Sequence, residues 1–208
     1  MKPTIALDID DTVLNFSKPL LSDLNAHFNK NVSYDELLNQ HWVKTHFPEA
    51  KLNDHATHEF YWRLVPSSVT LFESDCWKLF KDNFNIHVVT ARSLVLGEMA
   101  MTATSSWLKK WSLGATGLSI THPDENKVHY VPSNTIAFIE DSPKVAKDAL
   151  EAGKHVYMIN RPWNTSFLYE RKRVGQPMLT KADTLEELVR QLLKDYRGGP
   201  YLPPDHPV

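Results

Sequence analysis

Short apolar runs that each end in polar residues recur along this chain. They cover residues 5–7, 86–89, 135–139 and 155–159, and a weaker one covers 118–120. Runs of this length are typical of strands that are buried on both faces of a parallel sheet. We therefore expect five parallel strands at these positions.

Helical patterns lie between the apolar runs. The spacing of apolar residues predicts four helices, at residues 75–82, 97–111, 142–150 and 184–196. Ser142 suits the N-cap of one helix and Pro143 its first position, while Thr184 and Glu187 have the spacing of a capping box. Strands that alternate with helices predict an α/β fold, a doubly wound Rossmann-like sheet with helices on both faces.

Residues 17–74 interrupt this alternation. They carry helical patterns and aromatic side chains, but no run that suits a parallel strand. We expect a small helical cap domain inserted after the first strand, with residues 1–16 and 75–197 forming the core domain. Residues 198–208 are rich in Gly and Pro and are expected to form an irregular tail.

The composition is that of a globular protein without special partners. The chain has 208 residues, a net charge of −2 and one cysteine, which excludes an internal disulfide. No apolar run approaches the roughly 20 residues of a membrane span, and no signal sequence precedes the first strand. We expect a cytoplasmic protein with no bulk electrostatic attraction to membranes or nucleic acid. The many aromatic residues leave a homodimer open.

Acidic residues gather at the carboxyl ends of the expected strands. Asp8 and Asp10 follow the first strand, and Glu140 and Asp141 follow the strand at 135–139. Ligands bind beyond this edge of a parallel sheet, so the four carboxylates should converge. Two charges about 4 Å apart repel by about 4 kcal/mol at an effective dielectric of about 20. A divalent cation would relieve this repulsion, and oxygen ligands favour Mg²⁺.

The spacing of these residues indicates phosphoryl chemistry. Asp8, at the strand end, can attack phosphorus in line, and Asp10 can protonate the leaving oxygen and then activate water. An Asp-x-Asp pair alone is more often a solvated acidic turn. Here Thr90 ends another strand and can hold a phosphate oxygen, and Lys127 precedes the strand at 135–139 and can offset phosphate charge.

Taken together, these segments resemble the haloacid dehalogenase (HAD) superfamily of phosphohydrolases. The four matching motifs are residues 8–13, residues 88–92, Lys127 and residues 139–143. The resemblance covers roughly residues 3–16 and 80–165. It implies a HAD-like sheet, a Mg²⁺ cofactor and hydrolysis of phosphate monoesters through an aspartyl-phosphate intermediate.

The resemblance also implies the roles of the acids. Asp8 would be the nucleophile and Asp10 the general acid and base. Asp8 and Asp141 would bind Mg²⁺ directly, Asp10 would bind it through its main-chain carbonyl, and Glu140 would hold a metal-bound water.

Phosphate binding is implied for a second group of residues. Thr90 and Lys127 would contact the phosphoryl group, which backbone N–H groups, including that of Ala91, would surround. Arg92 lies next to this site and is either a further phosphate contact or a surface charge. Lys109, Lys110 and Lys144 compete with Lys127 on composition, although their positions suit the third motif less well.

Further details resemble the 5'-nucleotidases related to 5'(3')-deoxyribonucleotidases. These are the position of the cap, the Phe60-Tyr61-Trp62 segment, the fourth motif and residues 160–164; the first motif differs, because Asp11-Thr12 replaces Gly-Val. The resemblance implies a mononucleotide substrate. A base needs a flat apolar partner. The stacking candidates, which also suit packing between cap and core, are Phe16, Trp42, Phe47, Phe60 and Trp62.

Other functions remain open at this point. The substrate could be a phosphosugar, another small ester or the 3'-phosphate end of a polynucleotide. Outside enzymes, a phospho-acceptor signalling domain also uses acids, Mg²⁺, a threonine and a lysine on a parallel sheet. Its phospho-accepting aspartate lies on a middle strand, whereas the strand at 86–90 ends in Thr90. The intact set of acids argues against an inactive relative.

Overall fold

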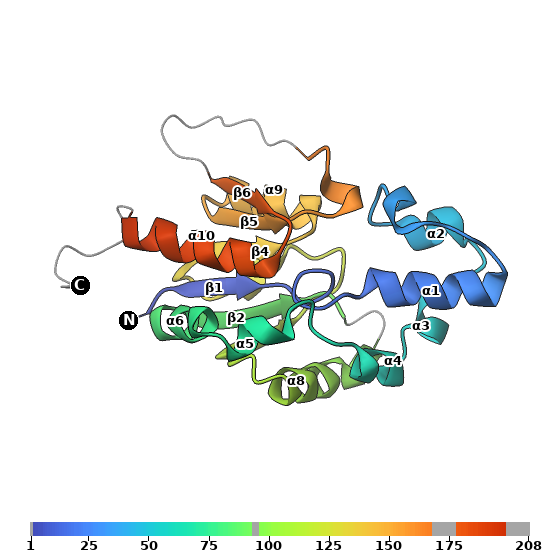
Figure 1. The fold of residues 1–208 in the computed structure, drawn as a ribbon, viewed down its shortest axis with the longest axis horizontal. Helices are drawn as coiled ribbons and strands as arrows, with labels where there is room; N and C mark the ends of the chain where they lie inside the picture. The colour runs from blue at the N-terminus through green and yellow to red at the C-terminus, as the bar shows by residue number, and fades with distance from the viewer. Residues whose placement is uncertain (1, 93–95, 168–177, 199–208) are drawn as a thin grey trace.

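The computed structural model describes residues 2–92, 96–167 and 178–198. Figure 1 shows a strand-and-helix core, with several short helices lying beyond the carboxyl end of β1. Within the described residues, no helix combines the length and the apolar character that a membrane span requires.

The core is a six-stranded sheet in the order β3-β2-β1-β4-β5-β6, and every neighbouring pair is parallel. This order confirms the doubly wound α/β fold. The strands are β1 (Thr4–Leu7), β2 (Asn85–Thr90), β3 (Gly117–Ile120), β4 (Thr135–Glu140), β5 (His155–Ile159) and β6 (Leu179–Ala182). The first five match the predicted strands. The sequence did not predict β6, an edge strand whose four residues are all partly exposed, so it lacks the continuous apolar run of a buried strand.

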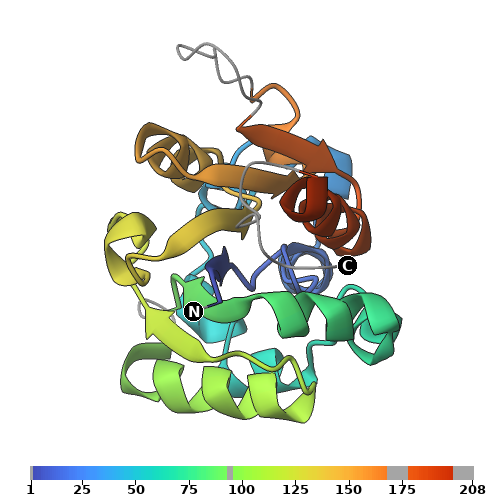
Figure 2. The same ribbon diagram turned by 90° about the vertical axis from the view of Figure 1, so that its left-hand side faces the viewer.

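Successive side chains of the strands point to opposite faces of the sheet. Ile5 and Leu7 of β1 belong to the larger apolar cluster, which contains residues of α6 (Asp75–Asn83), α8 (Ala100–Lys110) and α10 (Leu185–Gly198) as well as residues of helices before residue 75. Ala6 between them belongs to a second cluster with residues of α9 (Pro143–Glu151). Figure 2 shows the sheet between α9 and the pair α6 and α10.

The predicted helix starts are present. The Ser142 hydroxyl accepts a hydrogen bond from the Val145 N–H at 3.5 Å, and Pro143 is the first residue of α9. At α10, the Thr184 hydroxyl accepts from the Glu187 N–H at 3.2 Å, and the Glu187 carboxylate accepts from the Thr184 N–H at 3.2 Å. The predicted helix at 97–111 is divided, because a 3₁₀ turn, η2 (Gly97–Met99), precedes α8.

Residues 17–74 contain short helices and one isolated bridge, between Leu14 and Pro66. The helices are α1 (Ser17–Phe28), the 3₁₀ turn η1 (Tyr34–Glu36), α2 (Trp42–His46), α3 (Leu52–His55), α4 (His58–Arg63) and α5 (Val69–Glu73). We keep the word cap for this segment, although its independence as a domain stays a prediction. Helix α10 extends to Gly198, and residues 199–208 of the expected tail lie outside the described residues.

One indole hydrogen bond lets us test the core. Trp77 of α6 is fully buried, and its Nε1–H donates to the Leu113 carbonyl at 3.1 Å. Trp77→Phe removes the donor and leaves that carbonyl unpaired, so we expect the free energy of unfolding to fall by at least about 1–3 kcal/mol. Trp62→Phe is the control, because Trp62 is 43% exposed. Urea titration should separate the two variants; equal stabilities would contradict this description of the core.

Candidate active site

The order of the strands places the site. The chain runs from β1 outward through β2 and β3 to one side, and through β4, β5 and β6 to the other, so the direction reverses between β1 and β4. A doubly wound sheet leaves a crevice at this switch point, beyond the carboxyl ends of its strands. Asp8 follows β1, Glu140 ends β4, and the Asp8 N–H donates to the Ile139 carbonyl at 3.0 Å.

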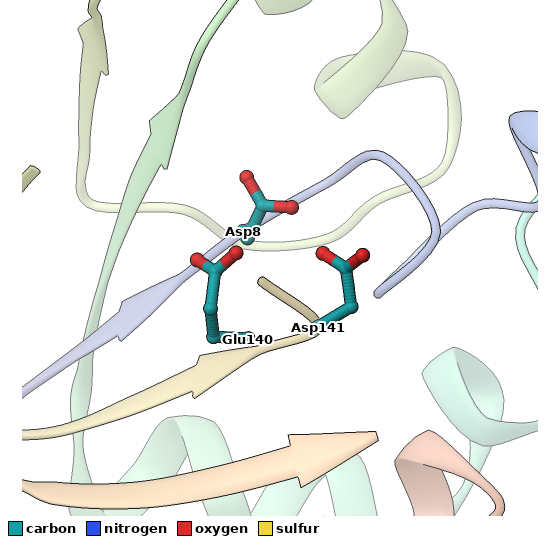
Figure 3. A group of neighbouring side chains, drawn as sticks. All are labelled: Asp8, Glu140 and Asp141. Carbon is teal, nitrogen blue, oxygen red and sulfur yellow. The ribbon is translucent and has the colours of Figure 1, made fainter. Parts of the chain in front are cut away.

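Three acidic side chains meet in this crevice. One carboxylate oxygen from each of Asp8, Glu140 and Asp141 lies within 4.8 Å of the other two (Figure 3). The three residues are only 4%, 1% and 6% exposed. Among the described residues, this is the one group of three or more His, Cys, Asp or Glu side chains that could hold a metal ion.

Burial makes two acids of this cluster, Asp8 and Asp141, hard to ionise. Burial, followed by the charge of Glu140, raises the pKa of Asp8 from 3.8 to about 8. The same two causes raise the pKa of Asp141 well above its usual range. The cluster therefore needs positive charge if its carboxylates are to act as ligands or as a nucleophile at neutral pH.

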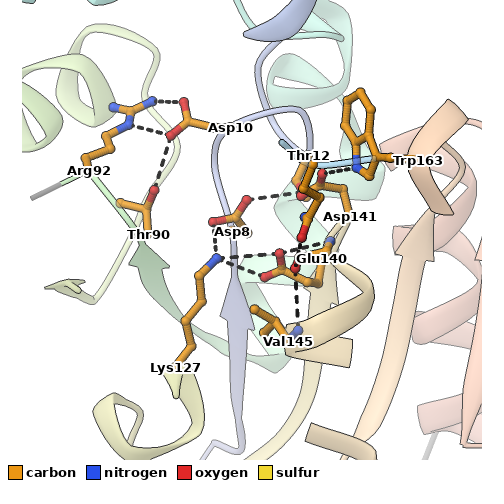
Figure 4. Close-up of polar contacts among 12 residues, drawn as sticks. Asp8, Asp10, Thr12, Thr90, Arg92, Lys127, Glu140, Asp141, Val145 and Trp163 are labelled. Carbon is orange, nitrogen blue, oxygen red and sulfur yellow. Dashed lines mark hydrogen bonds and ion pairs between the residues drawn. The ribbon is translucent and has the colours of Figure 1, made fainter. Parts of the chain in front are cut away.

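Lys127 supplies part of this charge. It lies in the 3₁₀ turn η3 (Lys127–Tyr130) and is buried. Its Nζ is 2.6 Å from Asp8 Oδ1 and 3.1 Å from Glu140 Oε2 (Figure 4). Burial alone would lower the pKa of Lys127, but the charges of Asp8 and Glu140 outweigh it and raise that pKa. The lysine is therefore held as an ammonium group against the proposed nucleophile.

The competing lysines lie elsewhere. Lys109 and Lys110 are exposed on α8. The exposed Lys144 donates to the carbonyls of Pro123 and Asp124. The geometry thus places Lys127 in the cluster and leaves these three outside it.

The donor set suits a magnesium ion. Three carboxylates and one ammonium carry a net charge of −2 when all are ionised, which one divalent cation would neutralise. All the acidic ligand atoms are oxygens, as Mg²⁺ prefers. Asp8 and Asp141 would be direct ligands. Glu140 accepts hydrogen bonds from Lys127 and from the Ser142 N–H at 3.2 Å, and its role through a metal-bound water stays a prediction.

Asp10 does not join the cluster, although the sequence predicts that four carboxylates converge. Its carboxylate instead forms two hydrogen bonds with Arg92, 2.7 Å from Nη2 to Oδ1 and 2.9 Å from Nε to Oδ2. The Thr90 hydroxyl also faces Asp10, at 3.4 Å (Figure 4). Only three acids therefore share the crevice, because an arginine holds the fourth on the other side of Asp8.

Arg92 is not a surface charge. It is 1% exposed and its guanidinium lies 4.4 Å from the ring centre of Tyr61, a cap residue on α4. Its Nη1 donates to the Thr104 hydroxyl at 3.4 Å. Arg92 therefore joins Asp10 to both the cap and α8. Whether it also contacts a phosphate stays a prediction, as it does for Thr90 and Ala91.

Asp11 forms the turn that leads from the site to the cap. It has a left-handed backbone, with φ of 58°, and its carboxylate accepts hydrogen bonds from the N–H groups of Phe16 and Ser17 at 3.1 and 2.9 Å. Burial raises the pKa of Asp11 to about 6, although the bonds from Ser17 oppose this. The Arg161 Nε–H donates to the Asp11 carbonyl at 2.7 Å. The connection between core and cap is therefore held from two sides.

Two residues that make polar contacts with the cluster were not predicted from the sequence. The Thr12 hydroxyl lies 3.5 Å from Asp8 Oδ2 and 3.4 Å from Asp141 Oδ1. The Trp163 Nε1–H donates to Asp141 Oδ2 at 2.9 Å. Thr12 lies inside the first motif, so its place could have been noticed. Nothing in the local sequence around Trp163 indicates where its ring points.

The candidate stacking residues fall into two groups. Trp42, Phe47 and Phe60 are buried in the main apolar cluster, where packing already covers their rings. Phe16 is half-buried and stacks against Tyr61 at 5.5 Å, and Trp62 is 43% exposed beneath the Lys110 ammonium. Phe16 and Trp62 thus keep exposed surface that a ligand could contact without repacking the cap.

Comparison with known proteins shows which solved structures share this fold. Neither a protein-family model nor a curated protein sequence matches the chain. Solved structures do match. A predicted phosphatase from Clostridium acetobutylicum has a TM-score of 0.59 at 12% identity, with 93% of this chain and 99% of that chain covered. The L-2-haloacid dehalogenase from Xanthobacter autotrophicus has a TM-score of 0.57 at 10% identity, with 95% and 99% covered.

A third match holds a metal. YfnB from Bacillus subtilis, a protein assigned to the HAD hydrolases and bound to magnesium, has a TM-score of 0.52 at 15% identity, with 92% of this chain and 98% of that chain covered. Identities this low establish the fold alone. The chain therefore has the fold of the haloacid dehalogenase-like hydrolases.

Proposed function

We propose that this chain is a Mg²⁺-dependent phosphohydrolase of the HAD superfamily that forms an aspartyl-phosphate on Asp8. One observation carries the proposal: the Asp8 carboxylate lies 2.6 Å from a buried lysine, within a cluster of three buried acids at the switch point of a HAD-like sheet. A lysine against the nucleophile and an acidic cluster that suits a cation are what binding a phosphate dianion beside a carboxylate requires.

The chemistry proceeds in two balanced steps. One Asp8 oxygen attacks phosphorus, the bond to the ester oxygen breaks, and the leaving oxygen takes a proton from Asp10. Water then attacks the same phosphorus and returns a proton to Asp10. The bond from phosphorus to Asp8 breaks, which releases inorganic phosphate and restores both carboxyl groups.

The surrounding residues prepare these steps. Lys127 holds one oxygen of Asp8 and can neutralise charge on a phosphoryl oxygen. Arg92 fixes the Asp10 carboxylate with two hydrogen bonds, and the remaining lone pairs of that carboxylate can take the proton. When bound, Mg²⁺ would neutralise the acids and polarise the phosphoryl group.

For the substrate, we propose a nucleoside monophosphate, with the chain acting as a 5'-nucleotidase. Phe16 and Trp62 support this choice, because both side chains keep exposed surface, and stacking on an aromatic ring is worth about 1–3 kcal/mol per base. A substrate of this size needs no basic surface, in keeping with the net charge of −2.

Dehalogenase activity of this chain needs a separate test, because L-2-haloacid dehalogenases share the fold. A 2-haloacid is also an anion, but it has no phosphoryl group to engage both a cation and Lys127. The phosphate ester is favoured because the three buried acids suit a cation and Lys127 lies against Asp8 and Glu140, so both positive groups can engage a phosphoryl group.

The first prediction concerns turnover. With Mg²⁺, the natural protein should release phosphate from 5'-nucleoside monophosphates faster than from sugar phosphates or a 3'-phosphorylated oligonucleotide, and should release no halide from 2-chloropropionate. Asp8→Asn should reduce the rate to background, because the amide cannot attack phosphorus. Asp23→Asn, at an exposed position of α1, is the control. Activity in the Asp8→Asn variant would refute the nucleophile, whereas preference for another ester would refute only the substrate.

The second prediction concerns Lys127. Lys127→Met should lower kcat by about 10²–10³-fold, the usual effect of removing one group that stabilises transition-state charge. Because it leaves buried acids unpaired, it should also destabilise the metal-free protein by about 3–5 kcal/mol, to be measured by urea titration. Lys109→Met, on the exposed face of α8, should change neither quantity. Near-normal kcat in a folded Lys127→Met protein would remove this residue from the proposed mechanism.

The third prediction concerns pH. In the metal-free protein, Asp8 holds its proton more tightly when folded, since its pKa is raised from 3.8 to about 8. Its contribution to stability is therefore complete below pH 3.8 and is lost as the pH rises through about 8. In EDTA, the Tm should fall more between about pH 5.5 and 8.5 in the natural protein than in Asp8→Asn.

Magnesium should change this profile. At about pH 8.5, Mg²⁺ at about 100 times its dissociation constant should stabilise the natural protein by about 2.7 kcal/mol. At about pH 5.5 the same concentration of Mg²⁺ should stabilise the protein less, because a proton competes with the ion for the Asp8 carboxylate. A pH profile that Asp8→Asn leaves unchanged would show that Asp8 ionises normally in the folded protein.

A further inference from the structure

A single tryptophan contacts the acidic cluster. Trp163 belongs to the 3₁₀ turn η4 (Pro162–Asn164), which follows β5, and it is 8% exposed. Its Nε1–H donates to Asp141 Oδ2 at 2.9 Å, as Figure 4 shows. None of the steps proposed above uses this residue.

The chemistry of the indole group makes this contact directional. The indole N–H is only a donor, so it can pair only with a lone pair of the Asp141 carboxylate. The other oxygen of Asp141 lies 3.4 Å from the Thr12 hydroxyl. Contacts to both oxygens fix the rotation of the carboxylate plane, and each oxygen keeps a lone pair that can face a cation.

The backbone around Trp163 is fixed by the neighbouring residue. Asn164 is fully buried, and its Nδ2 donates to the Asp141 carbonyl at 2.7 Å and to the Ile159 carbonyl at 2.9 Å. The side chains of Trp163 and Asn164 therefore both hold Asp141, one at its carboxylate and one at its backbone.

A cap residue covers the indole. The ring of Tyr34, in η1, lies 6.1 Å from the Trp163 ring in an edge-on arrangement. Nearby, the Ser142 hydroxyl donates to Gln40 of the cap at 3.0 Å. Trp163 and Asp141 are both buried, and a hydrogen bond in such a place is electrostatically stronger than one in water.

We infer that Trp163 is a positioning residue of the metal site, which holds the Asp141 carboxylate in the orientation that binds Mg²⁺. The inference rests on the proposed function, because that function makes Asp141 a metal ligand. Hydrogen bonds to the ligands of a metal commonly change its affinity by about 10–100-fold. A tryptophan that only filled space would leave the affinity unchanged once the protein was folded.

The direct test is calorimetry with Mg²⁺ alone. Trp163→Phe keeps an aromatic ring but removes the N–H donor, and circular dichroism and the Tm in EDTA check its folding. We expect its dissociation constant for Mg²⁺ to rise by about 10-fold or more. Phosphate release should recover when Mg²⁺ is raised in proportion. Trp111→Phe, at the C-terminal end of α8 and with no hydrogen bond from its indole N–H to the cluster, should bind Mg²⁺ as the natural protein does.

A second measurement follows the binding of Mg²⁺ to the natural protein. The chain has six tryptophans, whose indole ¹H–¹⁵N signals can be followed during a Mg²⁺ titration. The Trp163 signal, identified by its loss in Trp163→Phe or by through-space contacts to Thr12, should shift most.

The outcomes separate the two proposals. If the natural protein binds Mg²⁺ but Trp163→Phe has the same affinity, or the Trp163 signal does not shift, the inference about Trp163 is wrong and the proposed function stands. If the natural protein does not bind Mg²⁺ at all, the metal-dependent function fails and the inference fails with it.

Discussion

The contact of one buried ammonium group with two of three buried carboxylates is the constraint on which the rest of this structure depends. Parallel pairing of β1 with β4 brings Asp8 beside Glu140 and Asp141, in a place with little water. Lys127 offsets only one of the three negative charges, and burial still raises the pKa of Asp8 to about 8. A divalent cation would complete the balance, and in doing so would give Asp8 the ionised form that a nucleophile needs.

The cap is joined to this cluster by polar contacts rather than by apolar packing alone. Asp11 binds the start of α1 and receives a hydrogen bond at its carbonyl from Arg161. Arg92 lies between Asp10 and the ring of Tyr61 in α4. On the opposite side, the ring of Tyr34 covers that of Trp163. Movement of the cap would therefore act on Asp10 and on Asp141 of the proposed metal site, as closure over a small substrate requires.

The features of the fold that local sequence patterns determine were predicted from the sequence. Buried strands β1 to β5 have continuous apolar runs, and the starts of α9 and α10 have capping residues, so both were found. The edge strand β6 has neither signal. The position of Lys127 inside the cluster depends on how η3 packs against α9 and β2. Composition alone cannot separate Lys127 from Lys109 or Lys144. The pairing of Asp10 with Arg92 and the bond from Trp163 to Asp141 join residues far apart in the chain, so only the folded structure reveals them.

The most direct test is to find the cation itself. Crystals of the protein soaked in Mn²⁺, which has the ligand preference of Mg²⁺ and an anomalous signal, would place the ion without reference to activity. We predict one strong peak, about 2.0–2.3 Å from carboxylate oxygens of Asp8 and Asp141, beside Lys127 and with Trp163 still bonded to Asp141. A crystal with no peak among Asp8, Glu140 and Asp141, or with Mn²⁺ bound only at exposed acids, would contradict the charge balance on which the proposed function rests.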